Sequence, residues 1–230
     1  MSLAAQPPLS LSPQTRERIA THRSSPVAVS VLDKDARPVE GASVHLRMSE
    51  HDFMFGTGGV HARMLAEPQQ TPFNKHLAEL FNTVVFGNDH KWEHWENINI
   101  RKETIEAMAW IRAQGLRLRG HTMVWQSTRF TPLPRDVERM IASDSDSLRP
   151  VAAQRTLGHI ADIGRFCDDQ VVHWDVLNEQ VEHHVLTDYL NPGVEHWRAP
   201  AMRDWFRQAA DAAPRAQLYL NEYHILVGDY

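Results

Sequence analysis

The chain has 230 residues, of which 42% are hydrophobic and 23% are charged. These proportions are those of an ordinary globular protein and argue against a disordered chain, a collagen-like repeat or a helical membrane protein. The formal net charge is −5, with the 14 histidines counted as neutral, so no basic field exists to attract nucleic acid or an anionic membrane. We therefore expect neither nucleic acid nor a membrane among the partners.

Cys167 is the single cysteine, so no internal disulfide can form, and we expect it to be a small buried side chain. Residues 1–12 lack both the basic start and the apolar run of a secretory signal. The compartment stays open on this evidence, and secretion or export to the periplasm is favoured if a leader has been removed.

The first 50 residues have a pattern of their own. Residues 13–23 are predicted to form a short polar helix, and a turn is predicted at residues 33–38. Apolar side chains recur at every second position on either side of that turn: Val27, Val29 and Val31, then Val44, Leu46 and Met48. This alternation predicts a β-hairpin, so residues 1–50 are assigned to a helix-and-hairpin appendage and residues 51–230 to a second domain.

From Phe53 onward, short apolar runs alternate with apolar stripes at helical spacing, which predicts repeated βα units and a parallel sheet. Five strands are predicted to begin near Phe53, Thr83, Arg117, Val171 and Gln217. Helices are predicted between them, on stripes led by Phe73, Ile100, Leu157 and Met202. Each unit takes about 40 residues, so the chain has no room for the eight units of a closed (β/α)₈ barrel. The sheet is therefore either open or part of a larger whole.

Polar and aromatic residues follow four of the predicted strands. Because the carboxyl ends of parallel strands meet at one edge, we expect these side chains to lie on a common rim. Tryptophan and tyrosine faces stack on sugar rings, while amides and carboxylates bind hydroxyl groups, so the set suggests a sugar site. The residues are Asn88, Asp89, His90, Lys91 and Trp92; His121, Thr122, Trp125 and Gln126; Trp174, Asp175, Asn178 and Glu179; and Asn221, Glu222, Tyr223 and His224.

Four runs, in order, carry a more specific signal: FNTVVFGNDHKWEHWE, RLRGHTMVWQ, HWDVLNE and LYLNEYHI. They resemble successive strand ends of glycoside hydrolase family 10, the endo-β-1,4-xylanases, over roughly Phe53 to Leu226. The resemblance implies an α/β fold of the (β/α)₈ TIM-barrel type, present here as strands 1 to 5 of 8. It also implies a β-1,4-linked polysaccharide or oligosaccharide, such as xylan, as substrate. No cofactor is expected, and no Walker or G-x-G-x-x-G loop is present.

The resemblance also implies residue roles. Glu179 would be the general acid/base of a retaining hydrolase that cleaves internal β-1,4 bonds, and Asn178 would bind the sugar 2-hydroxyl. The non-reducing side of the cut would be bound by Asn88, Lys91, His121 and Trp125, and the leaving-group side by Asn221 and Tyr223.

Two departures from the family pattern bear on activity. Gly87 stands where the family has a glutamate that binds the substrate, so the accepted glycan is expected to differ. The family nucleophile is a glutamate on the seventh strand, and a retaining mechanism needs both carboxyls. No counterpart is found in this sequence, and Glu222 is the nearby alternative. We therefore expect the chain as given to be inactive without strands 6 to 8.

Two other functions compete with the hydrolase. A non-catalytic or inactive β-glycan-binding protein on the same fold would retain the aromatic residues and lack the carboxylate pair. A barrel metallohydrolase would use imidazoles at strand ends, with His121, His173, His183 and His184 as ligands. Because neither an H-x-H nor an HExxH pattern is present, we assign no metal ligand from the sequence.

Overall fold

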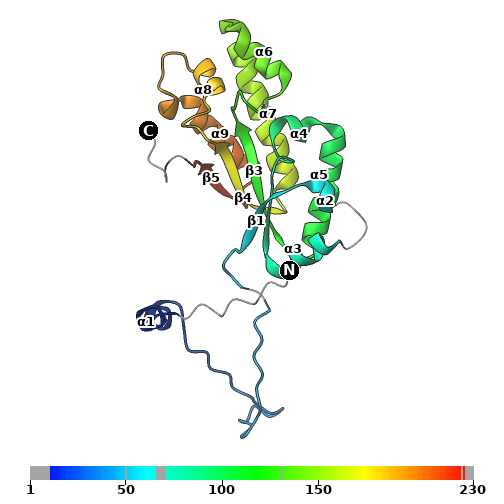
Figure 1. The fold of residues 1–230 in the computed structure, drawn as a ribbon, viewed down its shortest axis with the longest axis vertical. Helices are drawn as coiled ribbons and strands as arrows, with labels where there is room; N and C mark the ends of the chain where they lie inside the picture. The colour runs from blue at the N-terminus through cyan, green and yellow to red at the C-terminus, as the bar shows by residue number, and fades with distance from the viewer. Residues whose placement is uncertain (1–10, 50, 66–70, 131, 224, 226–230) are drawn as a thin grey trace, which may run out of the picture. The chain divides into compact units, whose positions relative to one another are not determined.

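The structure is a computed structural model that describes residues 11–49, 51–65, 71–130, 132–223 and 225 (Figure 1). The chain divides into two compact units, residues 1–48 and residues 49–230. His224, one of the residues that the sequence places on the rim, lies outside the described residues.

The first unit contains the predicted helix, α1 (Pro13–His22). The Ser12 hydroxyl accepts the backbone N–H of Thr15 at 3.1 Å, and Pro13 occupies the first turn, where its missing N–H costs nothing. The N-terminal end of α1 is thus defined by a side-chain cap and a proline.

The structure does not show the hairpin predicted for residues 27–48. Its turn is present, because the Asp33 carboxylate accepts the backbone N–H groups of Asp35 and Arg37. Beyond the turn, Leu32 and Pro38 form one isolated antiparallel bridge and no strand is assigned between residues 24 and 49. The apolar side chains of both arms are exposed, and a two-stranded ribbon without a packed face is marginally stable in water.

The second unit is built on one parallel sheet whose five strands lie in chain order (Figure 1). Four strands begin at the predicted residue, and the first begins three residues later than predicted. Phe53 and Phe55, which precede it, are exposed and contact each other. The strands are β1 (Gly56–Val60), β2 (Thr83–Phe86), β3 (Arg117–Trp125), β4 (Val171–Asn178) and β5 (Gln217–Asn221).

The four predicted helices are present as α3 (Pro72–Leu80), α5 (Ile98–Ala113), α7 (Arg149–Cys167) and α9 (Pro200–Ala212), which lie between successive strands. Helices α5 and α7 pack on β3, and α9 packs on β4 and on α7. None of the described helices has the length and apolar character needed to cross a bilayer. The helices of this unit are α2 (Ala62–Leu65), α3 (Pro72–Leu80), α4 (Trp92–Glu96), α5 (Ile98–Ala113), α6 (Arg135–Ser143), η1 (Asp146–Leu148), α7 (Arg149–Cys167), α8 (Val185–Leu190), η2 (His196–Arg198) and α9 (Pro200–Ala212).

The core between β3 and β4 depends on one glycine. Gly120 and Trp174 are register partners on the two strands, and the Trp174 indole lies directly over Gly120. Any β-carbon at position 120 would overlap that ring. Trp174 is fully buried and lies 5.2 Å from the His90 ring, centroid to centroid, while His90 also contacts Phe86. Cys167 is buried at the end of α7, as expected.

Candidate functional site

The carboxyl ends of β3, β4 and β5 form the central part of the candidate site. Trp125 is the register partner of Asn178, and Asn178 is in turn the register partner of Asn221. Three residues from three different strands therefore stand in a row at one edge of the sheet. This is where parallel α/β folds place their functional groups.

Glu179 directly follows this row and turns away from the strand. Its φ of 55° lies in the left-handed region, which is uncommon for a residue other than glycine and is often found at functional positions. The Trp125 indole N–H donates to Glu179 Oε2 at 2.8 Å, and His183 Nε2 lies 3.5 Å from the same oxygen. The side chain is 22% exposed, so the carboxyl is held by its neighbours and still accessible.

Lys91 and Asn88 meet the same tryptophan. Lys91 Nζ lies 4.3 Å from the centroid of the Trp125 ring and donates to Asn88 Oδ1 at 2.7 Å. Burial lowers the pKa of Lys91, while the negative charges of Glu179 and Asp89 act in the opposite direction. The ammonium group is therefore partly desolvated and within the electrostatic field of Glu179.

A cavity of about 380 Å³ opens beside these residues. Its aromatic wall is formed by Trp125 and Phe130, whose rings are stacked with centroids 5.3 Å apart and planes 20° apart. Asn88, Lys91, His94 and Pro132 complete the lining. Aromatic rings together with amide, ammonium and imidazole groups are the residue types that bind the faces and hydroxyl edges of a sugar ring.

His121 lies below the strand ends and is engaged by Asp175. Its Nδ1 is 3.0 Å from Asp175 Oδ2, and Arg119 binds the other oxygen of the same carboxylate. The Asp175 side chain is 4% exposed. The carboxylate thus receives hydrogen bonds from two side chains, and because an ionised carboxylate can only accept, Nδ1 of His121 is the donor nitrogen.

The residues predicted for the leaving-group side lie apart from the Trp125 cavity. Asn221 Nδ2 donates to Asn178 Oδ1 at 2.7 Å, whereas the Tyr223 hydroxyl bonds to Glu182 in the loop after β4. The bond to Glu182 raises the pKa of Tyr223 to about 12. Tyr223 therefore remains a neutral hydroxyl group next to a carboxylate.

Glu222 is occupied by backbone groups. Its two oxygens accept the N–H of Val181 and the N–H of Tyr223, each at 2.9 Å. These bonds tie the end of β5 to the loop that follows Glu179. Glu222 therefore has a structural role here, and its geometry offers no support for a role as nucleophile.

Gly87, at the end of β2, packs against another glycine. A β-carbon at position 87 would lie 3.2 Å from Gly59 Cα, and the Gly87 N–H donates to Val60 O at 2.9 Å. Gly59 itself has a φ of +71°, which favours glycine. The close approach of β1 and β2 thus leaves little room for a side chain where the family pattern has a glutamate.

The structure adds three residues to the site that the sequence did not indicate: His94, Phe130 and Pro132. His94 is placed by α4 three residues after Lys91, a helical spacing that offered a usable signal. Phe130 lies in an irregular loop, and its sequence carried no such signal. Trp92, which the sequence places on the rim, is instead buried in packing, where its ring stacks on His159.

Solved xylanase structures share this fold. The structure of GH10 from Paenibacillus barcinonensis matches with a TM-score of 0.60 at 22% identity, over 75% of this chain and 51% of that one. Xylanase 10B from Thermotoga petrophila, solved in complex with xylobiose, matches with a TM-score of 0.58 at 19% identity, over 75% and 50% of the two chains. The five strands therefore correspond to part of a family 10 TIM barrel.

Curated relatives also match by sequence. Anti-sigma-I factor RsgI6 of Acetivibrio thermocellus is 28% identical over 90% of this chain and 25% of its own length. Endo-1,4-beta-xylanase B of Paenibacillus barcinonensis is 30% identical over 72% of this chain and 48% of its own length. The chain thus spans a quarter of the first relative and about half of the second. Residues 46–228 match the family Glycosyl hydrolase family 10, and because this match covers most of its length, the chain belongs to that family.

Proposed function

We propose that the protein is a retaining β-glycan hydrolase that cleaves internal β-1,4 bonds of xylan or a related polysaccharide, with Glu179 as general acid/base. The observation that carries the proposal is the contact between Glu179 and Trp125 beside the aromatic cavity. It joins a proton-transfer group to a surface suited to a sugar ring.

The surroundings of Glu179 support a role in proton transfer. A general acid must protonate the glycosidic oxygen and later deprotonate a water molecule, so it has to alternate between two charge states. The Trp125 N–H is a neutral donor, and both a carboxylate and a carboxylic acid can accept its hydrogen bond. Within the part of the chain that the structure describes, Arg119 binds Asp175, whereas Glu179 is contacted by the neutral Trp125 indole and by His183.

The cavity supports a sugar as substrate. Trp125 and Phe130 offer the flat face, and Asn88 and Lys91 offer hydrogen-bond partners for hydroxyl groups. Xylan is the proposed glycan because several of the relatives are named endo-1,4-beta-xylanases. The restricted space at Gly87 supports a preference that differs from that of family members with a glutamate at this position.

A retaining mechanism needs a second carboxyl about 5 to 5.5 Å from Glu179. We propose that strands outside the five described here supply it in the whole protein, since the chain spans about half of the xylanase it matches. Asp175 is not suited to the role, because it is buried and bound by Arg119 and His121.

The test compares two substrates in the whole protein. Replacement of Glu179 by alanine should lower xylan hydrolysis by about 10² to 10⁴-fold, the usual contribution of acid/base catalysis. Cleavage of an aryl β-glycoside with an activated leaving group should fall much less at its first step, and added azide should restore turnover as a glycosyl azide. Glu182→Gln, three residues along the same loop, is the matched control and should leave the ratio of the two rates unchanged. Equal loss on both substrates without azide rescue would remove Glu179 from this role.

A second candidate function is β-glycan binding without hydrolysis. It is favoured by the relative that covers 90% of this chain, which is named an anti-sigma-I factor. Calorimetric titration with xylohexaose should then give binding that Trp125→Ala weakens by about tenfold or more, while a reducing-sugar assay on the whole protein gives no turnover. Both functions predict binding, so the reducing-sugar assay separates them.

A further inference from the structure

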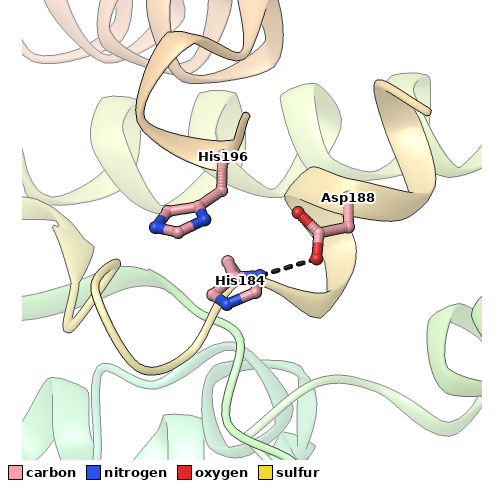
Figure 2. Close-up of side chains that lie close together, drawn as sticks. All are labelled: His184, Asp188 and His196. Atoms are coloured by element: carbon pink, nitrogen blue, oxygen red, sulfur yellow. Dashed lines mark hydrogen bonds and ion pairs between the residues drawn. The ribbon is translucent and has the colours of Figure 1, made fainter. Parts of the chain in front are cut away.

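The segment after β4 brings two histidines and an aspartate together (Figure 2). These three residues are not among those that line the cavity beside Trp125. His184 precedes α8, Asp188 lies one helical turn later, and His196 begins η2. Each residue offers one ligand atom, and these atoms all lie within 4.8 Å of one another. Two short elements that are separate in the sequence thus present three metal-binding groups to the same space.

We propose that His184, Asp188 and His196 bind one divalent transition-metal ion, with Zn²⁺ as the reference ion. Imidazole nitrogens and a carboxylate oxygen are donors suited to Zn²⁺, Co²⁺ and Ni²⁺, and less so to Mg²⁺ or Ca²⁺, which prefer oxygen ligands alone. Three protein ligands leave at least one coordination position for water or another ligand.

The three ligand atoms lie close to the spacing that a tetrahedral metal site requires. The His184 and His196 rings are stacked, with centroids 4.0 Å apart and planes 7° apart, and His184 Nδ1 lies 2.6 Å from Asp188 Oδ2. Around a tetrahedral ion with bonds of about 2.0–2.1 Å, ligand atoms lie roughly 3.3 Å apart. Figure 2 shows the two stacked rings beside Asp188, and rotation of each imidazole about its terminal torsion would unstack them.

The surroundings suit a cation. His184 and His196 are partly buried, whereas Asp188 is exposed, so an ion can enter from solvent. Glu195 lies beside His196 and attracts Arg198, whose nearest nitrogen is 3.9 Å from its carboxylate. The backbone of His196 is already anchored, because its carbonyl oxygen accepts a hydrogen bond from Gln180 at 3.3 Å.

The ion would join the start of α8 to η2. His184 also forms a parallel bridge with Gln126 at the end of β3, which ties this segment to the sheet. The ion would therefore stabilise the loop that begins at Glu179, and its presence does not depend on the function proposed for that residue.

The test is metal binding by the tag-free, metal-stripped chain. Calorimetric titration with Zn²⁺ should show one equivalent bound, and titration with Co²⁺ should give visible absorption bands of a low-symmetry site with nitrogen ligands. Trp197, which is exposed and has its ring 4.6 Å from the His196 ring, should lose fluorescence on Co²⁺ binding, and Trp197→Phe should abolish that part of the quenching.

Variants decide whether the triad is the site. His184→Gln, Asp188→Asn and His196→Gln should each weaken Zn²⁺ binding by about 100-fold or more, since even residues that only orient a metal ligand change affinity by 10 to 100-fold. His76→Gln is the matched control, because His76 and Glu79 form a similar exposed pair, 3.5 Å apart. It should bind Zn²⁺ like the unaltered chain. Absence of stoichiometric binding, or binding that survives all three triad substitutions, would overturn the proposal, and circular dichroism would confirm that each variant is folded.

Discussion

Asp175 and Glu179 lie four residues apart at β4 and have the same functional group, yet their surroundings differ in kind. Asp175 is inside the sheet, where Arg119 and His121 bind its carboxylate. Glu179 is beyond the strand end, where the neutral Trp125 indole donates to it and part of its surface faces solvent. We infer that side chains inside the β3–β4 pair stabilise the fold, and that side chains at its carboxyl end are accessible to solvent and ligands. Substitutions inside the pair should change the free energy of unfolding, and substitutions at its end should change it little.

The largest loss of stability is expected for Gly120→Ala. The added methyl group would overlap the Trp174 ring, and neither the strand backbone nor the buried indole can move freely. We expect the free energy of unfolding to fall by about 3 kcal/mol or more, at the upper end for overpacked cores. Urea denaturation measures it. Gly158→Ala in α7 is the control, because nothing lies within 4 Å of that position, and it should raise stability by up to ~1 kcal/mol. Equal effects of the two substitutions would contradict the interior packing described here.

The next largest loss of stability is expected for Asp175→Asn. It removes the charge that neutralises Arg119, whose side chain is 25% exposed, and should lower the free energy of unfolding by roughly 3 kcal/mol, the lower end for broken buried ion pairs. The control is Asp169→Asn, which breaks the exposed pair with Arg112 and should cost less than about 1 kcal/mol. Both are measured by urea denaturation at neutral pH. If the two variants lose the same stability, Asp175 is not the interior carboxylate that the comparison requires.

Acid should destabilise the fold through two buried histidines. Burial lowers the pKa of His90 and of His159 from 6.5 to about 3. Between these values the unfolded chain binds more protons than the folded one, so the free energy of unfolding falls as the pH falls through this window. The slope is up to about 1.4 kcal/mol per pH unit for each histidine. Stability is fully present above pH 6.5.

His90→Met isolates one of these two contributions. Neither ring nitrogen of His90 has a hydrogen-bond partner within the described part of the chain, so an apolar side chain of similar size should be tolerated. Between pH 7 and pH 5 the variant should lose about 2 kcal/mol less than the unaltered chain. Urea denaturation at both values measures the difference, and His159→Gln should remove a similar amount. An unchanged slope in both variants would show that neither histidine is buried in its neutral form.

The smallest change in stability is expected for Glu179→Gln. The amide oxygen can still accept the Trp125 N–H, so the free energy of unfolding should change by less than about 1 kcal/mol. Thermal and urea denaturation measure it, while activity of the whole protein is followed separately. A loss as large as that of Asp175→Asn would place Glu179 among the residues that stabilise the sheet.

Much of the second unit could be predicted from its sequence. The strand starts at Thr83, Arg117, Val171 and Gln217 agree with the structure, because short apolar runs that alternate with longer helical stripes are typical of repeated βα units. Four runs at the ends of successive strands, one of them around Glu179, indicated the family, and the family match confirms it. The hairpin was not shown, since alternation predicts a half-buried strand only where another surface covers its apolar side.

The sequence alone determined the order of the βα units and the rim at which Asn88, Trp125 and Glu179 lie. It also carried the motifs that indicate the family. Only the tertiary structure decided which groups touch. In the tertiary structure, Trp125 on β3 donates a hydrogen bond to Glu179 after β4, and Arg119 and His121 bind the carboxylate of Asp175. The His196 ring stacks on His184, although the two residues lie on either side of α8 in the sequence. The reason is physical: periodicity and motifs report local geometry, whereas these pairs depend on strand register and on loop paths that no local pattern encodes.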